Sequence, residues 1–155
     1  MKFSSHILIV ITIFWGFWLD NLISEFDIYL VETCIGFLTV SYWIYAIPER
    51  IQSSAALFYG LFVDLFFGTA IGFHMLFFAG ISYVIHVYVF RFRIFSYLQL
   101  IIFFAGSSVF YLACKYLIFS PENYSYLLLF SSFFINACLW LPIYFWMRSM
   151  RRRLL

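Results

Sequence analysis

Long apolar runs separated by short polar segments divide the chain from one end to the other. At a rise of about 1.5 Å per residue, roughly 20 apolar residues are enough for a helix to cross a hydrocarbon core of about 30 Å. The pattern predicts membrane spans at about residues 6–19, 28–47, 51–67, 73–90, 95–119 and 124–147. We therefore expect an all-α fold in which residues 1–155 form a single polytopic membrane domain with six transmembrane helices.

The ends of the spans carry the expected signals. The first span follows Lys2 and is predicted to leave the bilayer at Trp15, Trp18 and Asp20. No small-x-small cleavage site follows it, so we interpret it as a membrane helix and not as a signal peptide. An acidic loop is expected at residues 20–27, and Pro48 marks the end of the second span because proline cannot continue the helical hydrogen bonds.

The third span contains a stripe in which Gly60, Asp64, Gly68 and Gly72 recur at four-residue steps. Such positions lie on one helical face, and small residues there let a neighbouring helix approach closely in a membrane. A carboxyl group at membrane depth needs a partner, so it marks a functional or assembly site. The chain is expected to turn at residues 68–72 and to pair the third and fourth spans. The stripe serves either as internal packing or as a partner interface.

Composition supports a polytopic membrane protein. Hydrophobic residues make up 66% of the chain and aromatic residues 26%, whereas charged residues make up only 10%, against about 25% in soluble domains. A net charge of +2 is too small to indicate nucleic-acid binding. The cysteines lie inside apolar runs without metal-ligand spacing, so we expect neither a disulfide nor a metal site.

Basic residues favour one orientation. The predicted loops on one side and both termini carry eight of the 9 Lys and Arg residues, namely Lys2, Arg50, Arg91, Arg93, Arg148, Arg151, Arg152 and Arg153. The charged residues of the opposite loops are all acidic, namely Asp20, Glu25, Asp27 and Glu122. Because positive loops stay in the cytoplasm, both termini are predicted to be cytoplasmic.

Ionisable residues gather toward the outer half of the predicted bilayer. Glu32, Asp64, His74 and Lys115 form this candidate cluster. One interpretation is an outward polar cavity or a set of ion pairs. In the other, Lys115 extends to the headgroups and Glu32 sits at the interface, which leaves Asp64 as the one buried charge.

Catalytic chemistry has little support in the sequence. Only Asp64 is expected to lie deep, whereas acid and base catalysis on paired carboxylates needs two converging groups. No nucleophile elbow, His-Glu-x-x-His motif or phosphate-binding loop occurs. We therefore expect no enzyme activity and no cofactor. Asn136 is expected near mid-membrane, where its amide bonds either to another helix or to local backbone.

Three motifs in order carry a resemblance to a known family. They are Tyr42-Trp43-Ile-Tyr45-Ala-Ile-Pro48-Glu-Arg50, the Gly60 to Gly72 stripe, and Asn136-x-x-Leu-Trp140-x-Pro142 before an Arg-rich tail. Together they resemble the bacterial rod shape-determining protein MreD family. The resemblance implies a non-enzymatic scaffold of the cell-elongation machinery, or elongasome, that supports peptidoglycan synthesis. It also implies a location in the bacterial inner membrane and the partners MreC, MreB, a RodA-type glycosyltransferase and a class B penicillin-binding protein. The Arg-rich tail is expected to contact membrane lipid or the MreB side.

The span count is also similar to that of the substrate-binding S-components of energy-coupling-factor transporters. That likeness concerns the fold alone and carries no function. It nevertheless keeps an alternative open, in which the chain is a small-molecule or lipid-binding membrane subunit with an outward-facing pocket near Asp64, Glu32 and Lys115. The scarcity of converging polar groups favours the scaffold.

Overall fold

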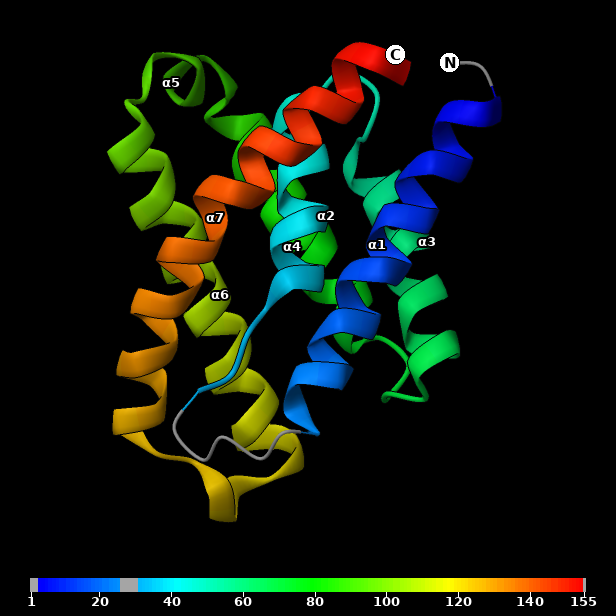
Figure 1. The fold of residues 1–155 in the computed structure, drawn as a ribbon. Coiled ribbons are helices and arrows are strands. Elements are labelled where there is room, and N and C mark those ends of the chain that lie inside the picture. Colours follow the sequence, from blue (N-terminus) through cyan, green and yellow to red (C-terminus); the bar gives the residue numbers. More distant parts are fainter. Residues whose placement is uncertain (1–2, 26–30, 155) are drawn as a thin grey trace. The chain divides into compact units, whose positions relative to one another are not determined.

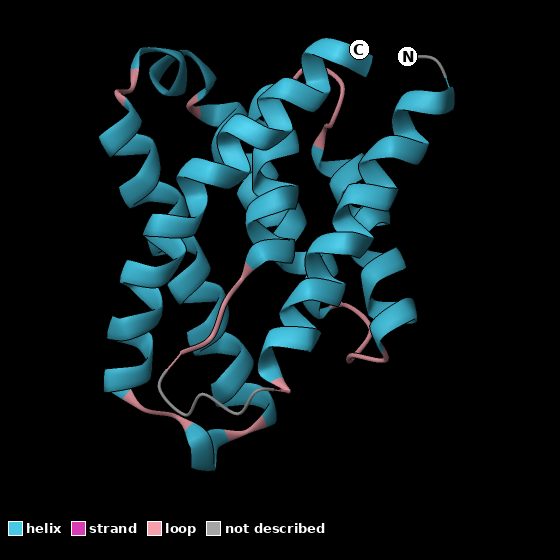
Figure 2. Cartoon of the chain, viewed as in Figure 1, coloured by secondary structure: helices cyan, strands magenta, loops and turns pink. Residues whose placement is uncertain are grey.

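The computed structural model describes residues 3–25 and 31–154, and no strand occurs among them (Figures 1 and 2). Its α-helices are α1 (Phe3–Ser24), α2 (Ile35–Ala46), α3 (Ser53–Phe67), α4 (Phe73–Val87), α5 (Val89–Ile94), α6 (Tyr97–Phe119) and α7 (Tyr126–Leu154), with a 3-10 helix, η1, at Pro121–Asn123. The prediction of an all-α fold is therefore confirmed for these residues, and its apolar helices are consistent with a membrane protein.

By length and composition, three helical segments in the described part of the chain could cross a membrane: His6–Ser24, Tyr97–Phe119 and Tyr126–Arg152. Three further apolar helices, α2, α3 and α4, are shorter, at 12, 15 and 15 residues. At about 1.5 Å per residue, a 15-residue helix is about 22 Å long, less than the hydrocarbon thickness of about 30 Å.

Several helix ends differ from the sequence-based limits. Helix α1 continues to Ser24, so the loop expected to begin at Asp20 is wrong for that stretch. Helix α2 begins only at Ile35, after a non-helical segment at residues 31–34. Lys2, Asp27 and the expected start of the second span at residue 28 lie outside the described residues. Hydropathy reports where a segment is apolar, and hydrogen bonding decides where its helix ends.

The C-terminal helix also extends beyond its predicted limits. Helix α7 passes through Pro142 and ends at Leu154, although the predicted span ended at residue 147. Pro142 is exposed. The arginines near the end of α7 are compatible with this extension, because arginine has a high helix propensity and its charge is well solvated by water.

The structure divides into two compact units, one formed by residues 1–39 and 97–155 and one by residues 40–96. In the second unit, α3 and α4 pack as an antiparallel hairpin, and their buried residues include Ala56, Val63, Phe78, Ile81 and Ile85. Gly68 ends α3 with φ 63° and Gly72 precedes α4 with φ 106°. These positive values favour glycine and explain why the chain reverses there.

In the first unit, α6 packs against α7 across the turn at η1 (Figure 1). The rings of Phe104 and Trp140 stack with centroids 4.1 Å apart. One face of α7 is buried, at the helical spacing expected for a packed stripe. Its residues are Leu128, Ser132, Asn136, Trp140, Ile143 and Met147. Two of these residues are polar, and both bond to the non-helical segment described below.

Candidate functional site

Asp64 organises the turn between α3 and α4. Its Oδ1 lies 2.6 Å from His74 Nδ1 and accepts a 2.8 Å hydrogen bond from Thr69 Oγ1. The backbone N–H groups of Gly72 and His74 donate to Oδ2 and Oδ1 at 2.9 and 3.2 Å. Asp64 and His74 are only 1% and 3% exposed. The carboxylate thus satisfies donors at the start of α4, where helix N–H groups lack intrahelical partners.

Gly60 lies one turn before Asp64, where α3 touches the backbone of α4. A Cβ built on Gly60 would lie 2.5 Å from Met75 N and Met75 Cα. Backbone atoms cannot move aside as a flexible side chain can, so only glycine permits this approach. Gly60 and Asp64 therefore both face α4 within the hairpin.

Gly68 and Gly72 do not continue this face, because α3 ends at Phe67. The expectation of one helical stripe through all four residues is thus wrong for its second half, while the expected turn at residues 68–72 is confirmed. A Cβ on either glycine would meet nothing within 4 Å. Backbone conformation, not crowding, explains glycine at these two positions.

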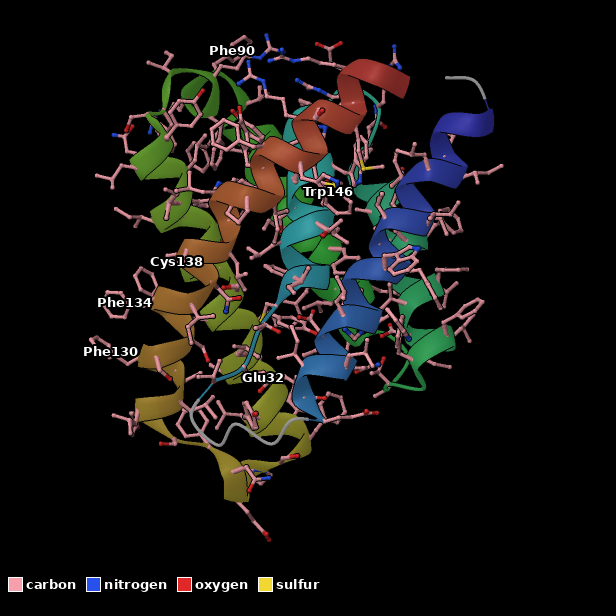
Figure 3. All side chains as sticks on the ribbon, in the orientation of Figure 1. Glu32, Phe90, Phe130, Phe134, Cys138 and Trp146 are labelled. Atoms are coloured by element: carbon pink, nitrogen blue, oxygen red, sulfur yellow. The ribbon has the colours of Figure 1, made fainter. Side chains whose placement is uncertain are left out.

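Glu32 and Lys115 form an ion pair in the other unit, with 2.6 Å between Glu32 Oε1 and Lys115 Nζ. The hydroxyl of Tyr116 donates a short hydrogen bond to Glu32 Oε2. The side chain of Lys115 is 43% exposed, whereas that of Glu32 is 17% exposed. Figure 3 shows Glu32 on the non-helical segment that precedes α2.

Side chains from one other helix, α7, bond to the backbone of this non-helical segment. Glu32 N–H donates to Ser132 Oγ at 3.2 Å, and Cys34 N–H donates to Asn136 Oδ1 at 2.9 Å. Ser132 and Asn136 are four residues apart and share the buried face of α7. Asn136 Nδ2 also donates to Glu32 O at 3.4 Å. The amide of Asn136 thus bonds to a distant segment and not to its own helix.

Asp20 caps the start of α2. Its Oδ1 accepts hydrogen bonds from Thr33 Oγ1 and Ile35 N–H, and its Oδ2 accepts one from Gly36 N–H, each at 2.8 Å. From the sequence, Asp20 was expected at the membrane surface, and this capping role was not predicted. Gly16, one turn before Asp20 in α1, lies against Gly36 of α2. A Cβ added to Gly16 would lie 2.8 Å from Gly36 Cα.

The four residues of the predicted outer cluster fall into two pairs, each inside one unit. Asp64 pairs with His74, and Glu32 pairs with Lys115. Among the described residues, no buried side-chain nitrogen or oxygen lacks a hydrogen-bond partner. No group of three or more potential metal ligands occurs within residues 3–25 and 31–154. The paired polar groups are thus committed to intramolecular bonds.

The site also contains residues that were not predicted from the sequence, namely Asp20, Thr33, Thr69, Tyr116 and Ser132. Thr69 had a usable signal, because it lies inside the predicted turn between two glycines. The sequence around Tyr116 and Ser132 carries no such signal, because these residues lie 84 and 100 positions away from Glu32 in the chain. Their roles depend on tertiary packing.

In its described residues the chain is thus an all-helical protein with helices apolar enough to cross a membrane, and its buried polar side chains cap helices and bond to interrupted backbone. Residues 1–153 match the family model described as rod shape-determining protein MreD, so the chain belongs to the MreD family. The family assignment made from the sequence motifs is thereby confirmed, and with it a role in rod shape determination. No significant match is found among curated proteins or solved structures.

Proposed function

We propose that this chain is a non-enzymatic scaffold of the cell-elongation machinery that docks MreC in the bacterial inner membrane. In this role it links the MreB filament system to a RodA-type glycosyltransferase and a class B penicillin-binding protein, which build peptidoglycan. The observation that carries the proposal is the family match over residues 1–153. The intramolecular use of the buried polar groups supports it, because such groups stabilise the fold and leave few convergent groups for chemistry.

The scaffold requires a defined topology, for which we propose six crossings with both termini in the cytoplasm. Helix α2 is 12 residues long, or about 18 Å, and residues 31–34 add at most about 14 Å. Together they match a hydrocarbon core of about 30 Å. Within its own unit, α1 begins and α7 ends at the same end in Figure 1, which agrees with termini on one side.

A non-helical segment inside a membrane is tolerated only where its backbone is satisfied by protein or water. Ser132, Asn136 and Asp20 supply that satisfaction to residues 32–36. This bonding supports a buried second crossing despite its short helix. We propose that the α3–α4 hairpin, whose helices have 15 residues each, turns within the outer half of the bilayer. There Asp64, paired with His74, satisfies the backbone N–H groups at the turn.

Two exposed helix faces suit the membrane helix of MreC. On α4, Gly80 lies between exposed Leu76 and Tyr83, and on α6, Gly106 lies between exposed Ile102 and Phe110. A Cβ on Gly80 or Gly106 would meet nothing within 4 Å. Each glycine leaves a shallow notch where a partner helix can approach closely.

Co-purification of the full chain with MreC in mild detergent tests the scaffold. Gly80→Leu and Gly106→Leu each fill one notch without an internal clash, so the variant that loses MreC identifies the docking face. Gly68→Leu, at the turn, tests the earlier expectation that the Gly60 to Gly72 stripe binds MreC. Retention of MreC by all three variants would exclude these surfaces, and failure of the unmodified chain to retain MreC would contradict the scaffold itself.

The ligand-binding alternative rests on Lys115, whose side chain is 43% exposed although it pairs with Glu32. An outward ligand with an anionic group could compete with Glu32 for this ammonium group. Native mass spectrometry of the purified chain distinguishes the two proposals. A stoichiometric small molecule that is lost in Lys115→Gln and kept in Arg152→Gln would favour the pocket.

A further inference from the structure

Helix α5, Val89–Ile94, turns two large apolar side chains away from the protein. Phe90 is 75% exposed and Ile94 is 84% exposed, whereas Phe92 between them is only 3% exposed. At about 100° per residue, Phe90 and Ile94 share one side and Phe92 lies nearly opposite. Figure 3 shows Phe90 at the outer edge of this helix. Phe92 anchors α5, and the apolar pair faces outward.

Two arginines flank the apolar pair. Arg91 and Arg93 are both exposed and lie about 80° to either side of the direction in which Phe90 and Ile94 point. The guanidinium of Arg91 lies 5.5 Å from the ring centroid of Tyr88. Arg93 Nη2 lies 3.4 Å from Glu49 Oε1, in a pair that water screens because both side chains are largely exposed.

The surroundings of α5 are basic. The Arg93–Glu49 contact brings the loop before α3 next to α5, and exposed Arg50 follows Glu49 in that loop. α5 and this loop together carry three arginines and one glutamate, which leaves an excess of positive charge. The exposed face of α4 ends at Val87, 54% exposed, and Tyr88 joins this helix to α5. An apolar helix end is thus followed in the chain by an apolar pair bordered by cations.

We infer that α5 lies in the membrane interface and binds anionic phospholipid. Phe90 and Ile94 insert among the upper acyl chains, while Arg91 and Arg93 extend sideways to the phosphate groups. Apolar side chains on one face with basic side chains at its borders are typical of helices that lie in an interface. The excess positive charge selects anionic over zwitterionic headgroups. This inference does not depend on MreC docking.

Hydrogen–deuterium exchange of the full chain in lipid nanodiscs tests the inference. Amides of residues 88–95 are expected to exchange at least tenfold more slowly in phosphatidylglycerol than in phosphatidylcholine discs, because headgroup binding holds the short helix in place. The double variant Arg91→Gln/Arg93→Gln is expected to remove this difference. Phe90→Ser/Ile94→Ser is expected to speed exchange in both lipids.

Arg151→Gln/Arg152→Gln is the matched control, since it removes the same charge from the end of α7. The control is expected to keep the difference between the two lipids at residues 88–95. Equal exchange of the unmodified chain in both lipids would overturn the inference and would leave the apolar pair open to a protein partner. An equal loss in the control would also overturn it, because net charge and not α5 would then attract the lipid.

Discussion

The Asp64 carboxylate lies 2.6 Å from His74 Nδ1 and, through its two oxygens, also holds Thr69 and the first N–H groups of α4. One side chain at the end of α3 therefore fixes the turn, the start of the next helix and a buried imidazole. The acidic residue that marked a candidate assembly site in the sequence closes a helical hairpin in the structure.

Asp64→Asn is expected to destabilise the chain. The amide keeps one acceptor oxygen but removes the charge and one of the two oxygens that hold α4. Hydrogen bonds to a charged group contribute about 1.5–3 kcal/mol each, so a loss of about this size is expected. Reversible unfolding of the full chain in mixed detergent micelles measures this loss. Glu49→Gln removes a carboxylate from an exposed pair and should cost less than about 1 kcal/mol, so equal losses would contradict the assigned role.

Gly60→Ala is expected to separate α3 from α4, because the added Cβ would lie 2.5 Å from Met75 backbone atoms. We expect a destabilisation of about 1–3 kcal/mol from overpacking. The same unfolding experiment measures it. Gly80→Ala is the matched control in the same hairpin, where the Cβ meets nothing and alanine favours the helix by up to about 1 kcal/mol. A Gly60→Ala variant as stable as Gly80→Ala would argue against the close contact.

Asp20→Asn is expected to loosen the start of α2. One oxygen remains to accept from Thr33 and Ile35, but Gly36 N–H loses its acceptor. An unsatisfied buried donor costs about 1–3 kcal/mol. Faster amide exchange at residues 35–37 reports the loss, whereas Glu25→Gln, at an exposed position, should leave it unchanged. Unchanged exchange in Asp20→Asn would show that the cap does not hold the helix.

Trp140→Ala is expected to open a cavity between α6 and α7. The ring is 1% exposed and stacks on Phe104, and truncating such an aromatic side chain costs about 3–5 kcal/mol. Trp146 lies on the same helix but is 57% exposed, so Trp146→Ala should change stability by no more than about 0.5 kcal/mol. Unfolding followed by circular dichroism measures both. A larger effect at Trp146 would contradict the packing.

Much of the fold could be read from local sequence. Apolar run lengths indicated a helical membrane protein, and paired glycines indicated the turn at residues 68–72. Both signals act over a few residues, because hydropathy and backbone freedom are local properties. The motifs around Asp64 and Asn136 likewise pointed to the MreD family, to which the chain belongs.

The partners of the polar residues could not be read in the same way. Asn136 bonds to Cys34 and Lys115 bonds to Glu32, contacts that join positions far apart in the chain. The same limitation explains why Asp20 looked like a surface residue, since an acidic group after tryptophans is typical of a membrane boundary. Its three donors lie 13 to 16 residues further along the chain.

By itself, the sequence determined that the chain is helical and apolar and that it belongs to one family, since composition, periodicity and ordered motifs are properties of the linear chain. Only the tertiary structure decided how the scarce polar groups are used. Asp64 and Asp20 each cap a helix, and Ser132 and Asn136 satisfy an interrupted backbone segment. The reason is that a buried hydrogen bond requires its donor and acceptor to meet in space, and folding alone brings them together.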